Sequence, residues 1–341
     1  MFFPEPAPDL GSGHVEQAAE EVAVSALTKP GEWTFGIQLP IQTLTRTLVD
    51  EWEDAATVDD LVAITKAADQ HGYDFVGVCD HVAIPDNDYA SKMTTTWYDT
   101  ISTLSYLAAH TQHTHLLSVV WIAAYRHPLQ TAKAFGTLDH LSGGRAILGV
   151  GAGHVEAEFD ALGVDFRTRG KRLDETLEAV RGAFADTYVS HEGEFFSYAD
   201  VGVSPQPQSE LPIWIGGAGK AAWKRTGRLG DGYIPMGLPK EQYPEAIGIM
   251  REAAVAAGRP EDVPLDVGYM TPWGYILGDP PEGIGMHWLQ GGPEGLAEDI
   301  RAARELGCNV VHLKFRARDA QEYADSLAAF SEIVVPLVNE G

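Results

Sequence analysis

The segment VDDLVAITKAADQHGYDFVGVCDHV, residues 58–82, contains one helix and one strand, and this unit decides the fold. Apolar residues recur at helical spacing in its first part, and Gly72 ends the predicted helix. The apolar run that follows predicts a buried strand, which places Asp80 and His81 at its carboxyl end. The function of these two titratable side chains depends on what lies at the ends of the other strands.

The same alternation of helix and strand recurs from Trp33 onward. Strand-like runs lie at 33–40, 73–82, 115–124, 145–153, 212–219, 231–237, 264–277 and 309–315, and helix-period segments follow them. Such alternation requires parallel strands, because each crossover helix returns the chain in the same direction. Eight units predict a (β/α)8 TIM barrel, whereas a doubly wound open sheet, the competing α/β fold, normally needs fewer strands.

The barrel is predicted as a single domain over residues 33–341. A polar stretch with glycine and proline predicts an insertion after the fourth unit, at about residues 188–211. Residues 1–32 lack the pattern of a signal peptide, and we expect an arm that is flexible or partly helical, with one short helix at 15–27. No run approaches ~18 apolar residues, so no membrane span is expected.

Composition restricts the partners. The 341 residues include 24 basic and 49 acidic side chains, for a net charge of −25. Nucleic acids and anionic membrane surfaces would repel such a chain, so neither is expected as a partner. The two cysteines, Cys79 and Cys308, are far apart, which is typical of a reduced compartment and predicts a cytoplasmic protein.

The predicted barrel mouth is rich in glycine and aromatic residues. In this fold the site lies at the carboxyl ends of the strands, and few carboxylates are found there. The lining suits a flat organic ligand with a phosphate better than hydrolysis by paired acids. His81 is the candidate proton donor or acceptor, and the alternative is a histidine satisfied by a backbone carbonyl. Asp80 either orients the His81 ring or caps the following helix.

Glycines at 215–219, IGGAG, stand between a strand and a helix. Their backbone N–H groups predict an anion site, and Lys220, Lys224 and Arg225 add positive charge; a tight turn is the alternative. The stretch GVGAGH at 149–154 lacks the G-x-G-x-x-G spacing of a dinucleotide site, although its glycines allow a ligand to approach closely.

Other patterns are less informative. The stretch HTQHTH at 110–115 has no accompanying carboxylate or cysteine cluster, so no metal site is expected. No serine stands in G-x-S-x-G, so a hydrolase of that type is unsupported. Trp97, Trp121 and Trp273 are either pocket walls or core residues.

The stretches CDHVAIP (79–85), 117–175 and PIWIGGAG (212–219) with GRLGDG (227–232) together resemble the luciferase-like superfamily. Within it they resemble the coenzyme F420 (deazaflavin)-dependent oxidoreductases of actinobacterial type, from about Trp33 to the carboxyl terminus. The resemblance implies a TIM barrel, F420 as cofactor, and hydride transfer between the deazaflavin C5 and a small organic substrate. It also implies a homodimer.

The resemblance further assigns roles to individual residues. His81 would lie beside the deazaflavin ring and manage its proton, with Asp80 next to it, and these two are the predicted catalytic residues. A non-proline cis peptide behind the ring would fall at Ser118–Val119. The predicted cofactor-binding residues are Gln38, Asp80, His81, Ser118, Val119, Trp121, Gly151, Ala152, Gly153, His154, Gly216, Gly217, Ala218 and Gly219.

One activity of the resembling family is not implied here. Its members that oxidise sugar phosphates carry glutamate at the position of His154, so the resemblance does not imply that activity.

Three functions remain open from the sequence. The first is the F420-dependent oxidoreductase. The second is an FMN-dependent monooxygenase, which uses reduced flavin and oxygen, and the third is a non-catalytic barrel that binds a flavin.

Overall fold

The computed structural model describes residues 26–45, 48–91, 93–278, 288–289 and 291–340. The predicted helix at 15–27 lies outside these residues except for its last two positions, which are not helical.

Parallel strands form the centre of the molecule. Their order is β3–β2–β1–β13–β10–β9–β8–β5, and β3 pairs with β5 to close the sheet. The bounds are β1 Thr34–Gln38, β2 Phe75–Val78, β3 His115–Ser118, β5 Ala146–Gly151, β8 Ile213–Gly216, β9 Gly232–Ile234, β10 Asp266–Met270 and β13 Val310–Leu313. β4, Trp121–Ile122, resumes the third barrel strand after a break and pairs with β5. The predicted (β/α)8 TIM barrel is therefore confirmed.

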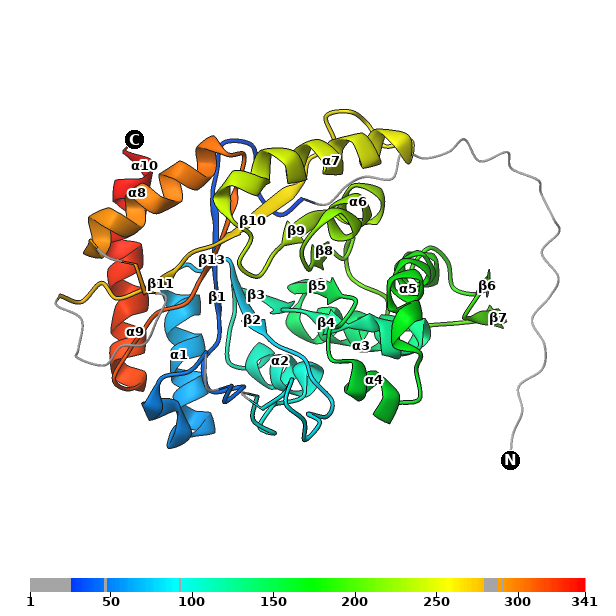
Figure 1. The fold of residues 1–341 in the computed structure, drawn as a ribbon, viewed down its shortest axis with the longest axis horizontal. Coiled ribbons are helices and arrows are strands. Elements are labelled where there is room, and N and C mark those ends of the chain that lie inside the picture. Colours follow the sequence, from blue (N-terminus) through cyan, green and yellow to red (C-terminus); the bar gives the residue numbers. More distant parts are fainter. Residues whose placement is uncertain (1–25, 46–47, 92, 279–287, 290, 341) are drawn as a thin grey trace.

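Helices surround this barrel (Figure 1). They are α1 Val58–Gln70, α2 Thr100–Ala108, α3 Pro128–Ser142, α4 Glu156–Ala161, α5 Arg169–Ala183, α6 Lys220–Leu229, α7 Tyr243–Ala256, α8 Gly292–Glu305, α9 Ala320–Ala329 and α10 Val335–Asn339. Short 3-10 turns lie at Glu51–Asp54, Ala123–Tyr125, Phe166–Thr168 and Lys240–Gln242, and a π-helical turn joins α9 to α10 at Phe330–Val334. None of the described helices is long and apolar enough to cross a bilayer.

Local signals explain several helix ends. Pro128 opens α3, where its missing N–H has no helical partner to lose. Gly143 ends the same helix at φ 73°, a left-handed conformation that glycine adopts without strain. Thr57 caps α1 by accepting a hydrogen bond from the Asp60 N–H.

The predicted insertion at about 188–211 contains an antiparallel hairpin, β6 Val189–Glu192 and β7 Ser197–Val201. It lies beside α5 at the edge of the molecule (Figure 1). The Glu175 carboxylate on α5 accepts hydrogen bonds from the backbone N–H groups of Phe195 and Phe196, which attaches the hairpin to the barrel. A second short pair, β11 Trp273–Gly274 and β12 Trp288–Leu289, is parallel.

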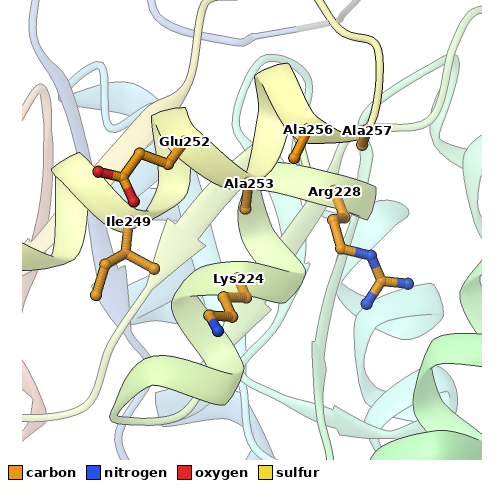
Figure 2. Close-up of a pocket in the computed structure, with 7 residues that line it drawn as sticks. All are labelled: Lys224, Arg228, Ile249, Glu252, Ala253, Ala256 and Ala257. Atoms are coloured by element: carbon orange, nitrogen blue, oxygen red, sulfur yellow. The ribbon is translucent and has the colours of Figure 1, made fainter.

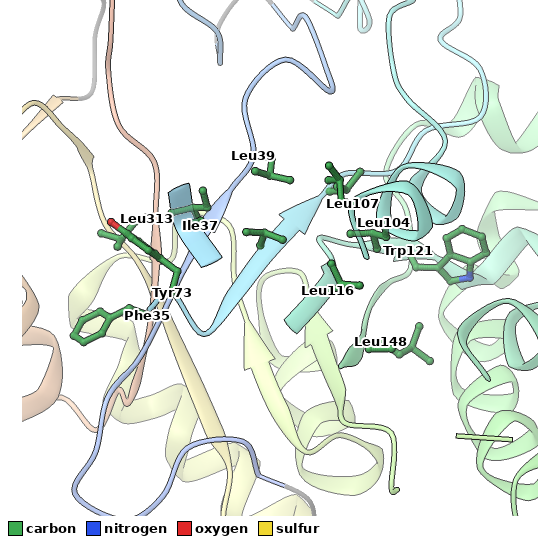
Figure 3. Close-up of a cluster of buried hydrophobic side chains, with 14 of the residues drawn as sticks. Phe35, Ile37, Leu39, Tyr73, Leu104, Leu107, Leu116, Trp121, Leu148 and Leu313 are labelled. Atoms are coloured by element: carbon green, nitrogen blue, oxygen red, sulfur yellow. The ribbon is translucent and has the colours of Figure 1, made fainter. Parts of the chain in front are cut away.

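Two apolar layers restrict where a ligand can enter. One cluster joins strand residues such as Ile37 and Leu116 to helix residues such as Leu104, and Figure 3 shows it between strands and helices. The other contains Phe75 and Val310, which belong to the alternate, inward register of their strands and fill the barrel interior. The carboxyl ends of the strands therefore remain as the open side.

The segment before β1 covers the opposite end of the barrel. Leu27 packs against the inward cluster, and the backbone N–H groups of Leu27 and Thr28 donate to the Asp266 carboxylate at 2.7 and 3.0 Å. Trp214 Nε1 donates to the same carboxylate at 3.1 Å. Asp266 thus anchors this segment beneath the filled end of the barrel.

Candidate active site

A cavity of about 700 Å³ opens at the carboxyl ends of the strands. Most of the predicted cofactor-binding residues line it: Asp80, His81, Val119, Gly151, Ala152, Gly153, His154, Gly216, Gly217 and Ala218. Gln38, Ser118, Trp121 and Gly219 do not belong to its lining. Since this cavity is the size of typical sites for small molecules, it is the candidate active site.

Two valines protrude into the barrel at its third strand. The cis peptide bond joins Val119 to Val120, so the prediction of Ser118–Val119 is wrong by one residue. Ser118 remains within β3, where its Oγ donates to the Gly149 carbonyl at 2.8 Å. Its hydroxyl is therefore committed to the barrel wall rather than to the cavity.

Glycines on the neighbouring strands make room for these valines. A Cβ at Gly77 would lie 2.7 Å from Cγ2 of Val119. At Gly151 and Gly216 a Cβ would lie 2.5 and 2.6 Å from the γ-methyl groups of Val120. Real Cβ atoms do not approach so closely, so the apolar surface made by the two valines depends on these glycines.

Trp121 lies outside the cavity. Its indole Nε1 donates to Thr131 Oγ1 on α3 at 3.1 Å, and its ring packs edge-to-face on Phe135. Figure 3 shows it with the core residues that pack between strands and helices, such as Leu104. Trp121 is therefore a core residue that does not line the cavity, and its role in binding the cofactor stays a prediction.

Asp80 holds the segment that follows the two valines. Its carboxylate accepts two hydrogen bonds from the Arg126 guanidinium, at 2.5 and 2.9 Å, and one from the Ile122 N–H at 2.8 Å. Both expected roles, orienting His81 and capping the following helix, are wrong; Asp99 caps α2 instead. A catalytic role for Asp80 stays a prediction, and the observed contacts are those of a positioning residue.

His81 is paired with Glu158 from α4. Its Nδ1 lies 2.9 Å from Oε2, and Oε1 accepts hydrogen bonds from the backbone N–H groups of Val82 and Ala83. Burial alone would raise the pKa of Glu158, but the His81 ring and these backbone donors outweigh it and hold the pKa below its usual value. A carboxylate at Nδ1 favours the tautomer that donates from Nδ1, which leaves Nε2 for a ligand.

Aromatic rings surround this pair. Trp97 packs edge-on against His81 with ring centroids 4.5 Å apart, and His154 lies 5.5 Å from the same ring. Burial, followed by the nearby His81 ring, lowers the pKa of His154, which favours its neutral form. Trp97 is therefore a cavity wall, whereas Trp121 is a core residue.

A glycine turn forms the opposite wall of the cavity. Gly217 and Gly219 have φ values of 107° and 82°, which strongly favour glycine, and α6 begins immediately after them. Tyr233 supports the turn from outside the cavity by donating from its hydroxyl to the Gly217 carbonyl at 3.0 Å. This geometry agrees with the predicted anion site at the start of a helix.

Three arginines, Arg167, Arg169 and Arg225, line the same cavity. Of these, the sequence predicted Arg225 but not Arg167 or Arg169. Arg225 is buried and pairs with Asp174 at 2.5 Å, so much of its charge is compensated. Arg169 stacks over the Phe166 ring at 3.8 Å and has no carboxylate partner in the described part of the chain. Arg167 is exposed at the mouth.

The other predicted cations do not reach the cavity. Lys220 pairs with Glu245 at 2.9 Å on the surface. Lys224 lies with Arg228 in a separate pocket of about 380 Å³ between α6 and α7, and Figure 2 shows Arg228 below Ala256 and Ala257. Of the three predicted cations, only Arg225 lines the cavity.

Sequence reasoning missed Glu158, Arg126 and His312. Glu158 is 77 residues from His81, and Arg126 is 46 residues from Asp80, so no local pattern connects either pair. His312, on β13, lines the cavity and is buried. The inward register of the last strand was the one available signal for it. Within the described residues, no group of three His, Cys, Asp or Glu side chains is placed to hold a metal ion.

Comparison with known proteins places the chain in a family. The model of the luciferase-like monooxygenase family matches residues 34–284. The F420-dependent glucose-6-phosphate dehydrogenase of Kineococcus radiotolerans is 33% identical over 201 residues, which are 57% of this chain and 58% of that protein. The chain thus matches less than two thirds of that relative's length.

Solved structures share the fold. Monooxygenase RslO1 from Streptomyces bottropensis superposes with a TM-score of 0.72 at 22% identity, over 89% of this chain and 99% of that one. An F420-dependent secondary alcohol dehydrogenase in complex with an F420–acetone adduct gives 0.72 at 17% identity, over 90% and 99%. Since the family model matches residues 34–284, which are more than half of the chain and include β1 to β10, the chain belongs to the luciferase-like monooxygenase family.

Proposed function

We propose that the protein is an oxidoreductase that uses coenzyme F420 to move a hydride between the deazaflavin C5 and a small organic substrate. The observation that carries the proposal is the His81–Glu158 pair: His81 lines a cavity whose wall also includes the apolar Val119 and Val120 and the glycine turn at 216–218. The 33% identity to an F420-dependent dehydrogenase supports F420 over other flavins.

The residues of the cavity fit such a cofactor. Val119 and Val120 offer an apolar surface for a flat ring, and a Cβ on Gly151 or Gly216 would collide with that surface. The turn at Gly217 and the charge of Arg169 suit a phosphate. When bound, F420 supplies a ring carbon that donates or accepts a hydride.

The chain's own groups would manage the proton and the solvent. His81 Nε2 is the atom that gives or takes a proton, because Nδ1 is committed to Glu158. The Glu158 carboxylate would stabilise the imidazolium that forms when His81 takes a proton. Trp97 and Ile122 cover apolar parts of the cavity, which keeps water from the reacting atoms.

The substrate is proposed only as a small organic molecule. Sugar-phosphate oxidation is not proposed, because the family resemblance implies glutamate, and not histidine, at the position of His154 for that activity. A cytoplasmic location and a homodimer stay predictions. The second candidate function is an FMN-dependent monooxygenase, supported by the description of the matching family and by an equally flat apolar surface for a flavin ring.

Titration of the purified protein with oxidised F420, and separately with FMN, tests the proposal. Binding should quench tryptophan fluorescence, because Trp97 lines the cavity. We expect micromolar or tighter binding of F420 and weaker binding of FMN. Tight FMN binding without F420 binding would favour the monooxygenase, and binding of neither would overturn the proposal.

His81→Ala then separates binding from catalysis. In a screen of alcohols and imines for F420 reduction or reoxidation, the variant should lose most turnover while its F420 affinity changes little. His115→Ala is a matched control, since His115 is on the barrel wall, bonds to the Asp74 carbonyl and does not line the cavity. Unchanged turnover in His81→Ala would exclude the proton role.

A further inference from the structure

His312 is a buried polar side chain whose hydrogen bonds are missing. It is 1% exposed, and neither ring nitrogen has a hydrogen-bond partner among the described residues. Its neighbours on the adjoining strands, Gly36 and Met270, bring no strong donor or acceptor. A buried polar group without a partner is costly, so the imidazole needs a partner that the barrel wall does not supply.

The cavity is where such a partner can come from. His312 belongs to the cavity lining together with Val119, Ile234 and Cys79. These neighbours are apolar or, for Cys79, a buried thiol whose pKa burial raises to about 11. We call this part of the lining, Cys79, Val119, Ile234 and the 1% exposed His312, the cavity floor, and His312 is its imidazole.

The charge of His312 restricts the class of ligand group. Burial, followed by the nearby Lys314 ammonium, lowers the pKa of His312 to about 4. A neutral imidazole offers one donor and one acceptor and attracts anions weakly. The floor thus suits an uncharged carbonyl, amide or imide group.

The two ends of the cavity differ in polarity. The mouth carries Arg167 and Arg169, which suit the phosphate of a cofactor, and the floor carries the neutral His312. A ligand with a charged tail and an uncharged polar ring matches this difference if its ring enters first. The rings of F420 and FMN both end in a pyrimidinedione, whose edge consists of carbonyl and imide N–H groups.

We propose that His312 hydrogen-bonds the carbonyl and imide edge of the cofactor ring and so sets the depth at which the ring binds. This inference rests on the proposed function, because it requires a ring of that kind in the cavity. His312 is a binding residue in this view, and His81 alone manages the proton.

The test uses His312→Leu, which keeps an apolar side chain of similar size. Removing an unpartnered imidazole should leave the stability of the cofactor-free protein unchanged or higher. The same change should weaken F420 binding by about tenfold in the fluorescence titration, the worth of one hydrogen bond. His312→Gln, which keeps a donor and an acceptor, should recover part of the affinity, and His115→Leu should bind F420 like the wild type.

Each outcome has a distinct meaning. If the wild type and His312→Leu bind F420 with equal affinity, the ring contact is overturned and the proposed function stands. If His312→Leu in addition has a raised KM for a substrate found in the screen, His312 contacts the substrate instead of the cofactor. Lower stability of cofactor-free His312→Leu and His312→Gln alike would mean that a bound water already satisfies the ring, which would overturn the argument that the imidazole needs the cofactor as its partner. Binding of neither F420 nor FMN by the wild type would overturn both proposals.

Discussion

The acid sensitivity of the fold should depend on His312. Burial and the Lys314 ammonium lower the pKa of this imidazole from 6.5 to about 4 in the folded protein. In the unfolded chain the same side chain takes up a proton near its ordinary pKa. Between these two values the unfolded state binds more protons, so the free energy of unfolding falls as the pH drops from about 6.5 to 4 and is unaffected above that range.

The size of this effect follows from the interval between the two pKa values, 6.5 and about 4. Each pH unit in that interval is worth about 1.4 kcal/mol, so His312 should remove about 3 kcal/mol of stability across it. His312→Leu and His312→Gln both lack the titrating group and should both retain that free energy.

Urea unfolding of the cofactor-free protein at about pH 7 and about pH 4.5 measures the effect. Other titrating groups, such as Glu158, contribute equally to all three proteins and cancel in the comparison. We expect both variants to lose about 2–3 kcal/mol less than the wild type between the two pH values. Parallel losses in all three proteins would refute the conclusion that His312 is buried and neutral.

Glu158→Gln should lower turnover by about 10²–10⁴-fold with little change in F420 affinity, because an amide cannot balance the charge of an imidazolium; an unchanged kcat would contradict this. Gly151→Ala should destabilise the protein by about 1–3 kcal/mol in urea unfolding, since its Cβ would lie 2.5 Å from Cγ2 of Val120. Gly182→Ala, with nothing within 4 Å of the new Cβ, should not destabilise, and equal effects at the two sites would count against the steric argument. Arg169→Ala should weaken F420 binding several-fold at low salt and less at high salt, and a salt-independent change would rule out an ionic role.

The sequence by itself determined the fold. Apolar periodicity is a local property, and each strand and helix of the barrel depends on it, as the segment 58–82 shows by folding into α1 and β2. Counting these units predicted the TIM barrel, and the position of strand ends then placed His81, His154 and the glycines of the β8–α6 turn in the cavity.

Only the tertiary structure decided how those residues are connected. The carboxylates of Glu158 and Asp80 pair with groups 77 and 46 residues away, and barrel closure brings each pair together. A run of apolar letters also does not show that Ser118 Oγ donates to the Gly149 carbonyl of β5 or that Trp121 Nε1 donates to Thr131 Oγ1 of α3. A contact across the barrel depends on the arrangement of several strands at once, and no stretch of sequence contains that information.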